Sequence, residues 1–324
     1  MVGSGVRHSL PCFCFQTMKR RERIVLVLFL LTPLLAYLIF RLALVPYGIY
    51  YSFTDMAFVG RKAWDWGFVG WQNYQHLLSD PEFLESCKNS FIYAVLCGLI
   101  GQFWLGFFIG MLIWEGKLKG GMRGWLTTLL SGIAIAAWVT TDTTAGFEWF
   151  AMLAKSGGML NKFLGLFGVG PIEWLRTEGG WLGIPTALYA LMIANVWKGT
   201  AFSMVMFSTG MEGIPREIYD AVKIDGANRW QEYSYITIPL LRYMFPFVLL
   251  MLFSGSFSQF GFLWILAGRT WPQANIGIYS YIVAFSRFQI GYGAAIAVVL
   301  GLIYLGFGLL QRRLRTEPEI VTGK

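Results

Sequence analysis

The chain alternates between long apolar stretches and short polar connections. Six stretches are long enough to cross a membrane as helices, because a helix rising ~1.5 Å per residue needs about 20 residues to span a hydrocarbon core of roughly 30 Å. They cover residues 24–45, 90–114, 124–144, 183–206, 245–266 and 294–310. Each must be helical, since lipid cannot satisfy an unpaired backbone amide. The pattern predicts an all-α integral membrane protein with six transmembrane helices.

The composition favours the same class. The chain is 56% hydrophobic and 14% charged, whereas a soluble domain carries about 25% charged residues. The first apolar stretch is too long for a cleavable signal peptide. The four cysteines and two histidines show no metal-ligand spacing, so no metal site is expected. The sequence also lacks a Gly-x-x-x-x-Gly-Lys-Ser/Thr phosphate loop and a Gly-x-Ser-x-Gly elbow, so we expect no cofactor and no catalysis in this chain.

Lysine and arginine are distributed unevenly among the connections. The two termini, the second-to-third connection and the connection at about 212–242 together hold twice as many of them as the other three connections. Because these residues are retained on the cytoplasmic side, both termini and the 212–242 connection are predicted to be cytoplasmic. The expected organisation is a cytoplasmic segment 1–23, a transmembrane domain 24–314 and a cytoplasmic tail 315–324. The net charge of +8 reflects this bias, and no nucleic-acid partner is expected.

The connection before the second apolar stretch carries a helix-start signal. Asp80 is a favourable N-cap and Pro81 suits the first helical position. We therefore expect a helix from Pro81 that continues into the second span. Trp64, Trp66 and Trp71 in the same connection fit an interfacial aromatic belt, with carbohydrate stacking as the alternative.

The 212–242 connection is the one charge-dense segment between apolar stretches. Pro215 is expected to end the fourth span, because proline removes a donor and restrains the residue before it. A short helix follows over 216–224, and Gly226 permits the left-handed turn that stops it. The alternative interpretation is an amphipathic loop on the membrane surface.

A second short helix is expected from Ala227 or Asn228. It would carry Trp230, Tyr233 and Ile236. Pro239 is expected to break the chain before the fifth span. The segment therefore has the spacing of a helix–turn–helix.

This connection resembles a known family motif. Asp220-Ala-Val-x-x-x-Gly226, nine residues and Ile236-x-Ile-Pro239 resemble the Glu-Ala-Ala, three residues, Gly, nine residues, Ile-x-Leu-Pro pattern of binding-protein-dependent ABC importer permeases. Further segments resemble the sugar-importing branch of the maltose and glycerol-3-phosphate type, namely Ile214-Pro215, Ile224-Asp225-Gly226-Ala227, Val69-Gly70-x-x-Asn73-Tyr74, Asn89-Ser90, Leu160-Asn161 and Val196-Trp197. The likeness runs from about residue 24 to residue 314. Asp220 and Val222 depart mildly from the motif, where Glu and Ala are usual.

The resemblance implies a type I ABC importer permease fold in the bacterial inner membrane. Its implied partners are a second homologous permease in a heterodimer, two ATP-binding-cassette ATPase subunits that hold ATP and Mg, and a periplasmic solute-binding protein. It implies that the 212–242 connection is the coupling loop, which binds an ATPase subunit. The residues implied in this contact are Glu217, Asp220, Ala221, Val222, Asp225, Gly226, Ala227, Ile236 and Pro239. The implied cargo is a carbohydrate. Within the branch, the chain resembles the larger permease of alginate-oligosaccharide importers, although no residue pattern by itself demands uronates.

Polar residues inside the spans are candidates for the transport pathway, because they are costly against lipid. The candidates are Asn195, Trp197, Lys198, Ser256, Gln259 and Trp264. Ser254 and Ser258 recur on the same stretch, with backbone hydrogen bonding as the alternative role. Arg41 could snorkel to the interface instead, and Asp142 is expected to lie wet at the outer end of the third span. An anionic sugar would find cations at Lys198, Arg269 or Arg287.

Two other classes remain open on the sequence. A secondary transporter is one, but six spans would be half of the usual folds and the intramembrane acids that couple to ions are missing. A scaffold or intramembrane enzyme is the other. Activity that survives ATP depletion would rule out an ATP-driven importer.

Overall fold

In the part of the chain that the structure describes, six helical segments are long and apolar enough to span a membrane. The computed structural model describes residues 20–42, 44–181, 184–268 and 271–314. The segments are Ile24–Ser52, Pro81–Lys119, Gly121–Val139, Thr186–Glu212, Phe245–Ala267 and Ile290–Leu314. The prediction of six apolar helices is therefore confirmed. The expected segments 1–23 and 315–324 lie largely outside the described residues, as does Arg269.

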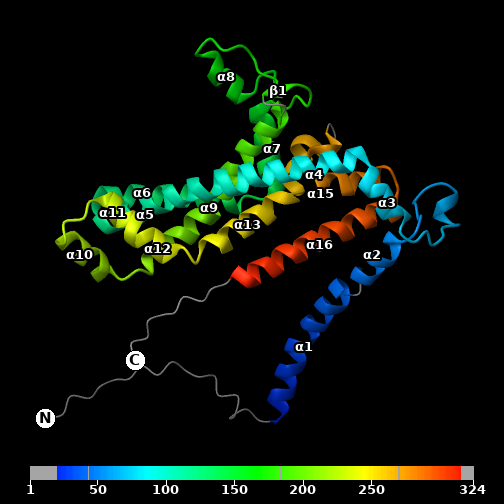
Figure 1. Ribbon diagram of the computed structural model, residues 1–324, viewed down its shortest axis with the longest axis horizontal. Helices are drawn as coiled ribbons and strands as arrows, with labels where there is room; N and C mark the ends of the chain where they lie inside the picture. Colours follow the sequence, from blue (N-terminus) through cyan, green and yellow to red (C-terminus); the bar gives the residue numbers. More distant parts are fainter. Residues whose placement is uncertain (1–19, 43, 182–183, 269–270, 315–324) are drawn as a thin grey trace.

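The first segment consists of α1 (Arg20–Leu42) and α2 (Leu44–Ser52). α1 stands apart from the other helices (Figure 1), and the most apolar part of this first segment is not buried against the rest of the protein. α2 packs against α16 (Ile290–Leu314), the last span. The side chain of Arg41 lies outside the described part of the structure.

The second segment is the longest, and it begins as the sequence predicts. The Asp80 carboxylate accepts a hydrogen bond from the Glu82 amide at 3.0 Å and caps α4 (Pro81–Tyr93). A π-helical segment, η2 (Ala94–Gln102), joins α4 to α5 (Phe103–Lys119). The expected short helix therefore runs directly into the span.

The third span is shorter than predicted. α6 (Gly121–Val139) stops before residue 144, because Thr140 and Thr141 leave the helical conformation. The Thr141 side chain then accepts a hydrogen bond from the Thr144 amide at 3.3 Å and caps a separate helix, α7 (Asp142–Leu153). Asp142 is thus the first residue of a new element.

A small module projects from the bundle between α6 and the fourth span (Figure 1). It contains α7, α8 (Met159–Gly165) and an antiparallel pair of short strands, β1 (Gly180–Trp181) and β2 (Ile184–Pro185). Asn161 holds it together: its amide donates to the carbonyl of Ile172 at 2.9 Å and its oxygen accepts from the Trp174 indole at 3.0 Å. The fourth span, α9 (Thr186–Glu212), follows directly.

The fifth span and the return to the last span are broken into short pieces. α13 (Phe245–Phe257) is followed by α14 (Gly261–Leu263) and the π turn η4 (Trp264–Gly268). The chain then passes through η5 (Pro272–Ala274), α15 (Ile276–Tyr281) and the π turn η6 (Ile282–Ser286). In the connection between the first and second spans, a single turn η1 (Arg61–Ala63) and α3 (Gln72–Ser79) precede α4.

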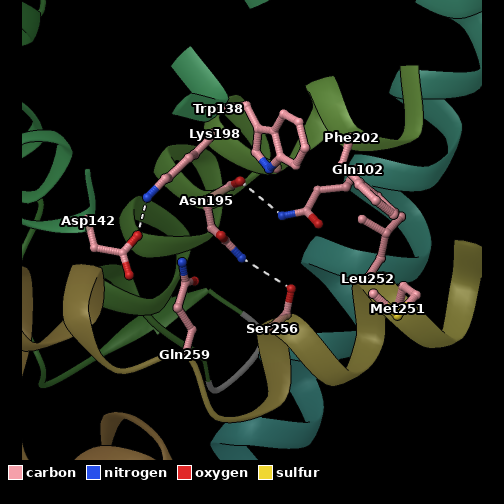
Figure 2. A pocket seen from close by; sticks show the side chains of 12 residues that line it. Gln102, Trp138, Asp142, Asn195, Lys198, Phe202, Met251, Leu252, Ser256 and Gln259 are labelled. Carbon is pink, nitrogen blue, oxygen red and sulfur yellow. Dashed lines mark hydrogen bonds and ion pairs between the residues drawn. The ribbon is translucent and has the colours of Figure 1, made fainter. Parts of the chain in front are cut away.

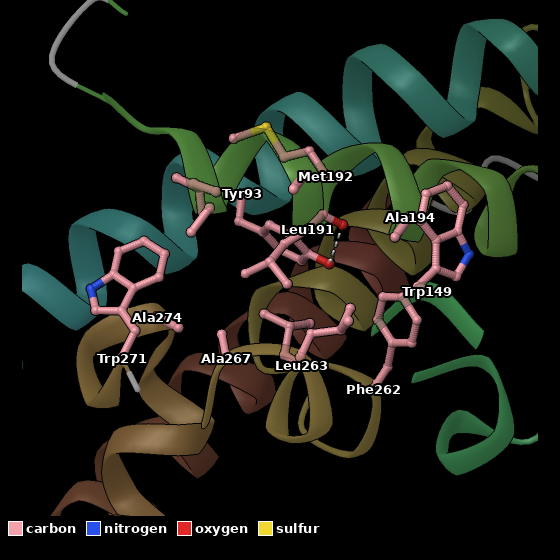
Figure 3. Packing of buried hydrophobic residues seen from close by; sticks show 14 of the residues in the cluster. Tyr93, Trp149, Leu191, Met192, Ala194, Phe262, Leu263, Ala267, Trp271 and Ala274 are labelled. Atoms are coloured by element: carbon pink, nitrogen blue, oxygen red, sulfur yellow. Dashed lines mark hydrogen bonds between the residues drawn. The ribbon is translucent and has the colours of Figure 1, made fainter. Parts of the chain in front are cut away.

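The largest buried cluster lies where α7, α9 and α14 meet η2 and α4. Tyr93, Leu191 and Phe262 are fully buried there (Figure 3). The Tyr93 hydroxyl lies 3.5 Å from the Leu191 carbonyl oxygen and 3.2 Å from Gln259 Oε1. This cluster fixes α9 relative to the fifth span.

α5 and α9 approach each other closely through glycines. A Cβ on Gly106 would lie 1.8 Å from Ser203 Oγ and 2.8 Å from the Met204 nitrogen, and one on Gly110 would lie 2.9 Å from the Met204 carbonyl oxygen. Glycines four residues apart let two helix backbones approach in a membrane. The second and fourth spans therefore depend on these two positions.

We expect Gly106→Leu to abolish assembly of the bundle, at a cost of more than about 4 kcal/mol, because the Met204 backbone cannot retreat as a side chain could. Gly132→Leu is the matched control, since a Cβ there has nothing within 4 Å. Size-exclusion chromatography and thermal unfolding in detergent measure the outcome. Equal yields and melting temperatures for the two variants would contradict the close contact.

A buried acid ties the start of the second segment to α15 and α16. Asp80 is 8% exposed and accepts hydrogen bonds from the hydroxyls of Tyr279 at 2.6 Å and Tyr292 at 2.5 Å. Burial raises the pKa of Asp80, but these hydrogen bonds outweigh it, so the pKa of the carboxyl lies below its usual value.

The lowered pKa of Asp80 predicts acid sensitivity. A carboxyl with a depressed folded-state pKa stabilises the fold above its unfolded pKa of about 3.9, and that stability is lost as the pH falls through the folded-state pKa. We expect the melting temperature in detergent to decrease when the pH is lowered below about 4. We expect Asp80→Asn to lower the free energy of unfolding by roughly 1.5–3 kcal/mol near neutral pH. Melting curves between acid and neutral pH test this. The variant should lose part of the pH dependence, and an unchanged profile would contradict it.

Candidate functional site

The connection after the fourth span folds as two short helices, as the sequence predicts. α10 (Arg216–Ile224) follows Pro215, and Gly226 adopts the left-handed conformation with φ 79°. Asn228 caps α11 (Arg229–Glu232) with a reciprocal capping box: its side chain accepts from the Gln231 amide at 2.9 Å, and the Gln231 side chain accepts from the Asn228 amide at 2.8 Å. The two helices lie at one end of the bundle (Figure 1).

Pro239 does not break the chain, contrary to the prediction. It lies in the first turn of α12 (Ile238–Leu241), which continues the π turn η3 (Tyr233–Thr237). The chain is helical from Arg229 to Leu241, and the π turn η3 departs from the four-residue hydrogen-bond register just before the proline. The chain turns instead at residues 242–244, before α13.

Most of the side chains that the resemblance singled out face outward. Glu217, Asp220, Ala221, Asp225, Gly226 and Pro239 are exposed, and Val222, Ala227 and Ile236 are half-buried. Ile224 and Trp230 expose 87% and 77% of their surface beside them. Exposed apolar side chains rimmed by charge are typical of a surface that binds another protein.

Tyr219, which the sequence did not single out, anchors α10. It is buried, its ring lies 4.8 Å from that of Trp114 on α5, and its hydroxyl is 3.1 Å from Thr237 Oγ1. The sequence alone could have indicated that Tyr219 is buried, because a large aromatic residue inside a polar helix commonly lies on its buried face.

A polar cluster on α5 holds both ends of the loop, and the sequence did not predict it. Glu115 accepts hydrogen bonds from Arg229 at 2.5 Å and from the Tyr233 hydroxyl, and its carboxylate is 18% exposed. We call these three residues the Glu115 clamp. Lys117 Nζ lies 2.6 Å from Glu212 at the other end of the loop. Burial and the Glu115 carboxylate raise the pKa of Tyr233, so its phenol remains a donor.

A cavity of about 390 Å³ opens between α9, α13 and η2. Its size lies within the range of about 300–1,000 Å³ that is typical of small-molecule pockets. Its lining consists of Gln102, Trp138, Asp142, Asn195, Lys198, Gly199, Phe202, Met251, Leu252, Gly255, Ser256 and Gln259 (Figure 2).

The polar groups of the cavity are linked to one another. The Gln102 amide donates to the Asn195 carbonyl at 2.9 Å, and the Asn195 amide donates to Ser256 Oγ at 3.3 Å. Lys198 forms an ion pair with Asp142 (Figure 2). The cavity wall is thus a hydrogen-bonded network that joins η2, α9 and α13.

The structure brings four of the six sequence-predicted pathway residues together at this cavity, namely Asn195, Lys198, Ser256 and Gln259. Trp197 and Trp264 lie outside its lining. The Trp197 ring packs 5.8 Å from that of Trp149, and the Trp264 ring stacks 5.6 Å from that of Phe260.

Gln102, Trp138 and Phe202 line the cavity but were not predicted. An amide such as Gln102 in an apolar run is a usable signal, because lipid-facing positions exclude it. The two aromatic residues carry no such signal, since apolar residues line both lipid and cavity.

Comparison with known proteins places the chain in a class. No family model matches it. A solved bacterial ABC transporter, involved in the import of the acidic polysaccharide alginate, shares its fold with a TM-score of 0.71 and 21% identity, over 91% of this chain and 98% of that chain. The molecule is therefore a multi-pass membrane protein with the fold of an ABC importer permease, as the sequence predicted.

Two relatives fix the family. The chain is 32% identical over 287 residues to a probable ABC transporter permease of Pyrococcus horikoshii, covering 86% of this chain and 91% of that protein. It is 30% identical over 263 residues to the trehalose/maltose transport system permease protein MalF of Thermococcus litoralis, covering 79% of this chain and 81% of that protein. The chain belongs to the ABC transporter permease family.

Proposed function

We propose that this chain is the membrane-spanning, non-catalytic permease subunit of an ATP-driven importer of carbohydrates. The polar cavity between the fourth and fifth spans carries the proposal. Its amide and hydroxyl groups both donate and accept hydrogen bonds, as sugar hydroxyls require, and Trp138 and Phe202 add aromatic surface. The relative named for trehalose and maltose supports the same cargo class.

The exposed loop supplies the link to ATP. We propose that α10 and α11 insert into a cytoplasmic ATP-binding-cassette subunit through Asp220, Ala221, Gly226 and their neighbours. ATP and Mg would bind to two such partner subunits. Closure of the ATPase pair would move the loop and favour the outward-facing arrangement of the spans, so this chain contributes a difference in stability between two states.

The remaining partners follow from the same class. A second permease would complete the pathway as a heterodimer and cover apolar surface such as that of α1. A periplasmic binding protein would deliver the sugar to the outer end. The chain would lie in the bacterial inner membrane with both termini in the cytoplasm, in agreement with its lysine and arginine distribution.

Reconstitution of the full complex in proteoliposomes tests the proposal. The measurements are uptake of radiolabelled oligosaccharides and ATP hydrolysis, with and without the loaded binding protein. We expect uptake only when ATP is present on the side of the membrane that carries the ATPase subunits. We also expect the sugar-loaded binding protein to stimulate ATP hydrolysis. Uptake that continues without ATP would point to a secondary transporter, and failure of every oligosaccharide to stimulate turnover would overturn the carbohydrate cargo.

A further inference from the structure

Lys198 and Arg287, two of the three cations that the sequence suggests for binding an anionic cargo, each form an ion pair with a carboxylate of the protein. Lys198 is 10% exposed at its side chain and forms an ion pair with Asp142. Arg287 lies 2.5 Å from Glu82, outside the lining of the cavity. Arg269 lies outside the described residues. An anionic sugar would therefore have to displace an existing partner.

Lys198 is held on two sides. Besides Asp142 at the start of α7, the Phe262 ring lies beneath its ammonium group, 6.0 Å from Nζ to the ring centroid. Removing the lysine from this setting would leave a carboxylate without its partner, and breaking a partly buried ion pair is costly. The pair therefore behaves as a fixed part of the wall.

The carboxylate is the more accessible member of the pair. The Asp142 side chain is 45% exposed, against 10% for Lys198, and these two are the charged residues in the lining of the cavity. The acid therefore presents more of its surface than the base does. A carboxylate on a ligand would be repelled by the exposed Asp142 carboxylate, and the pairing with Lys198 offsets part of that repulsion.

The rest of the polar lining is neutral. Gln102, Asn195, Ser256 and Gln259 present amides and a hydroxyl, which suit uncharged hydroxyls and have no preference for carboxylates. The rings of Trp138 and Phe202 lie 6.0 Å apart and offer an apolar face. A neutral sugar matches every one of these groups without breaking the ion pair.

We propose that Asp142 is a specificity-determining residue that makes the cavity select neutral oligosaccharides over oligouronates. This inference rests on the proposed carbohydrate transport. It departs from the resemblance to alginate importers, whose likeness in structure, at 21% identity, concerns the fold.

The test compares uptake of three trisaccharides by the full complex in proteoliposomes, with its binding protein and ATP. They are a neutral glucose trisaccharide, a uronate trisaccharide, and the same uronate trisaccharide with its carboxyl groups reduced to alcohols. The reduced sugar is the matched ligand, since it keeps the backbone and loses the charge. We expect the wild-type complex to transport it at least about tenfold better than the parent uronate, the factor that 1.4 kcal/mol of repulsion produces.

The variants isolate the permease from the binding protein, because the same binding protein serves every complex. Asp142→Asn should lower the ratio of reduced to charged uptake about tenfold by freeing the Lys198 charge. Asp142→Glu keeps the pair and should keep the ratio. Glu173→Gln removes an acid from the Lys155–Glu173 pair, outside the lining, and should change nothing. Lys198→Met leaves Asp142 alone and should raise the ratio, so it covers the case in which Asp142→Asn fails to assemble.

Each outcome decides the inference. Equal or better uptake of the charged uronate by the wild-type complex would overturn it, as would a ratio that Asp142→Asn and Lys198→Met leave unchanged. These results would leave carbohydrate import intact. Failure of all three trisaccharides and of every other sugar tested, despite active ATPase subunits, would instead overturn the proposed function, and this inference with it.

Discussion

Replacing Glu115 by Gln is expected to separate ATP hydrolysis from transport. Glu115 joins α5 to the 212–242 loop through Arg229 at 2.5 Å and the Tyr233 hydroxyl. A hydrogen bond to a charged group is worth about 1.5–3 kcal/mol, so the variant should lose roughly tenfold or more in sugar transported per ATP hydrolysed. Without these hydrogen bonds, movement of the loop would no longer be transmitted to α5, and ATP would be hydrolysed without transport. Paired measurement of uptake and phosphate release in proteoliposomes checks this.

The clamp also predicts how its variants combine. Arg229→Lys keeps the charge and should keep most of the coupling, whereas Arg229→Gln removes one of the hydrogen bonds to Glu115 and should lose part of it. Because Glu115→Gln already removes the ion pair with Arg229, the double variant should be no worse than Glu115→Gln alone. Asp65→Asn, which breaks an exposed pair with Arg61 between α2 and α3, is the control for loss of an acid. Additive losses in the double variant would show that Glu115 acts independently of Arg229.

Gly226→Pro is expected to remove the ATPase subunits from the purified complex while the chain still inserts into the membrane. Gly226 has φ 79°, and its amide donates to the Lys223 carbonyl at 3.1 Å. Proline cannot adopt a positive φ and has no amide hydrogen, so α10 and α11 would lose their relative orientation. The measurement is the stoichiometry of ATPase subunits that co-purify with the tagged permease.

The control for this variant uses the space around Gly226. A Cβ there has nothing within 4 Å, so only the backbone conformation is at stake. Gly226→Asn should retain the ATPases, because asparagine tolerates the left-handed region, and Gly226→Ala should cost about 1 kcal/mol. Stoichiometric ATPase on the proline variant would show that the loop is not the docking element.

Local signals in the sequence predicted local structure well. Asp80 and Pro81 start the second segment, Gly226 takes the left-handed turn, and Asn228 caps α11. Each of these depends on one residue and its immediate neighbours, so no knowledge of the tertiary structure is needed. The apolar stretches predicted the spans for the same reason, because length and composition alone satisfy the bilayer.

Predictions that depend on distant partners were less complete. Pro239 looked like a break, but it lies within a continuous helical segment, directly after a π turn. Trp197 and Trp264 share their spans with cavity residues yet pack elsewhere. Glu115 resembled an ordinary charged residue at a helix end, and its role depends on Arg229, more than a hundred residues away. Sequence spacing carries no information about such pairs.

The π-helical segment η2 determines how α5 is rotated about the helix axis relative to α4. It covers Ala94–Gln102, between Asp80 at one end and Glu115 at the other. Each residue of an α-helix advances the chain by about 100° around its axis. Removal or insertion of a single residue in η2 would therefore turn the Glu115 clamp away from the loop while the Asp80 network stayed in place. Natural variation within 94–102 should accordingly consist of substitutions without gaps.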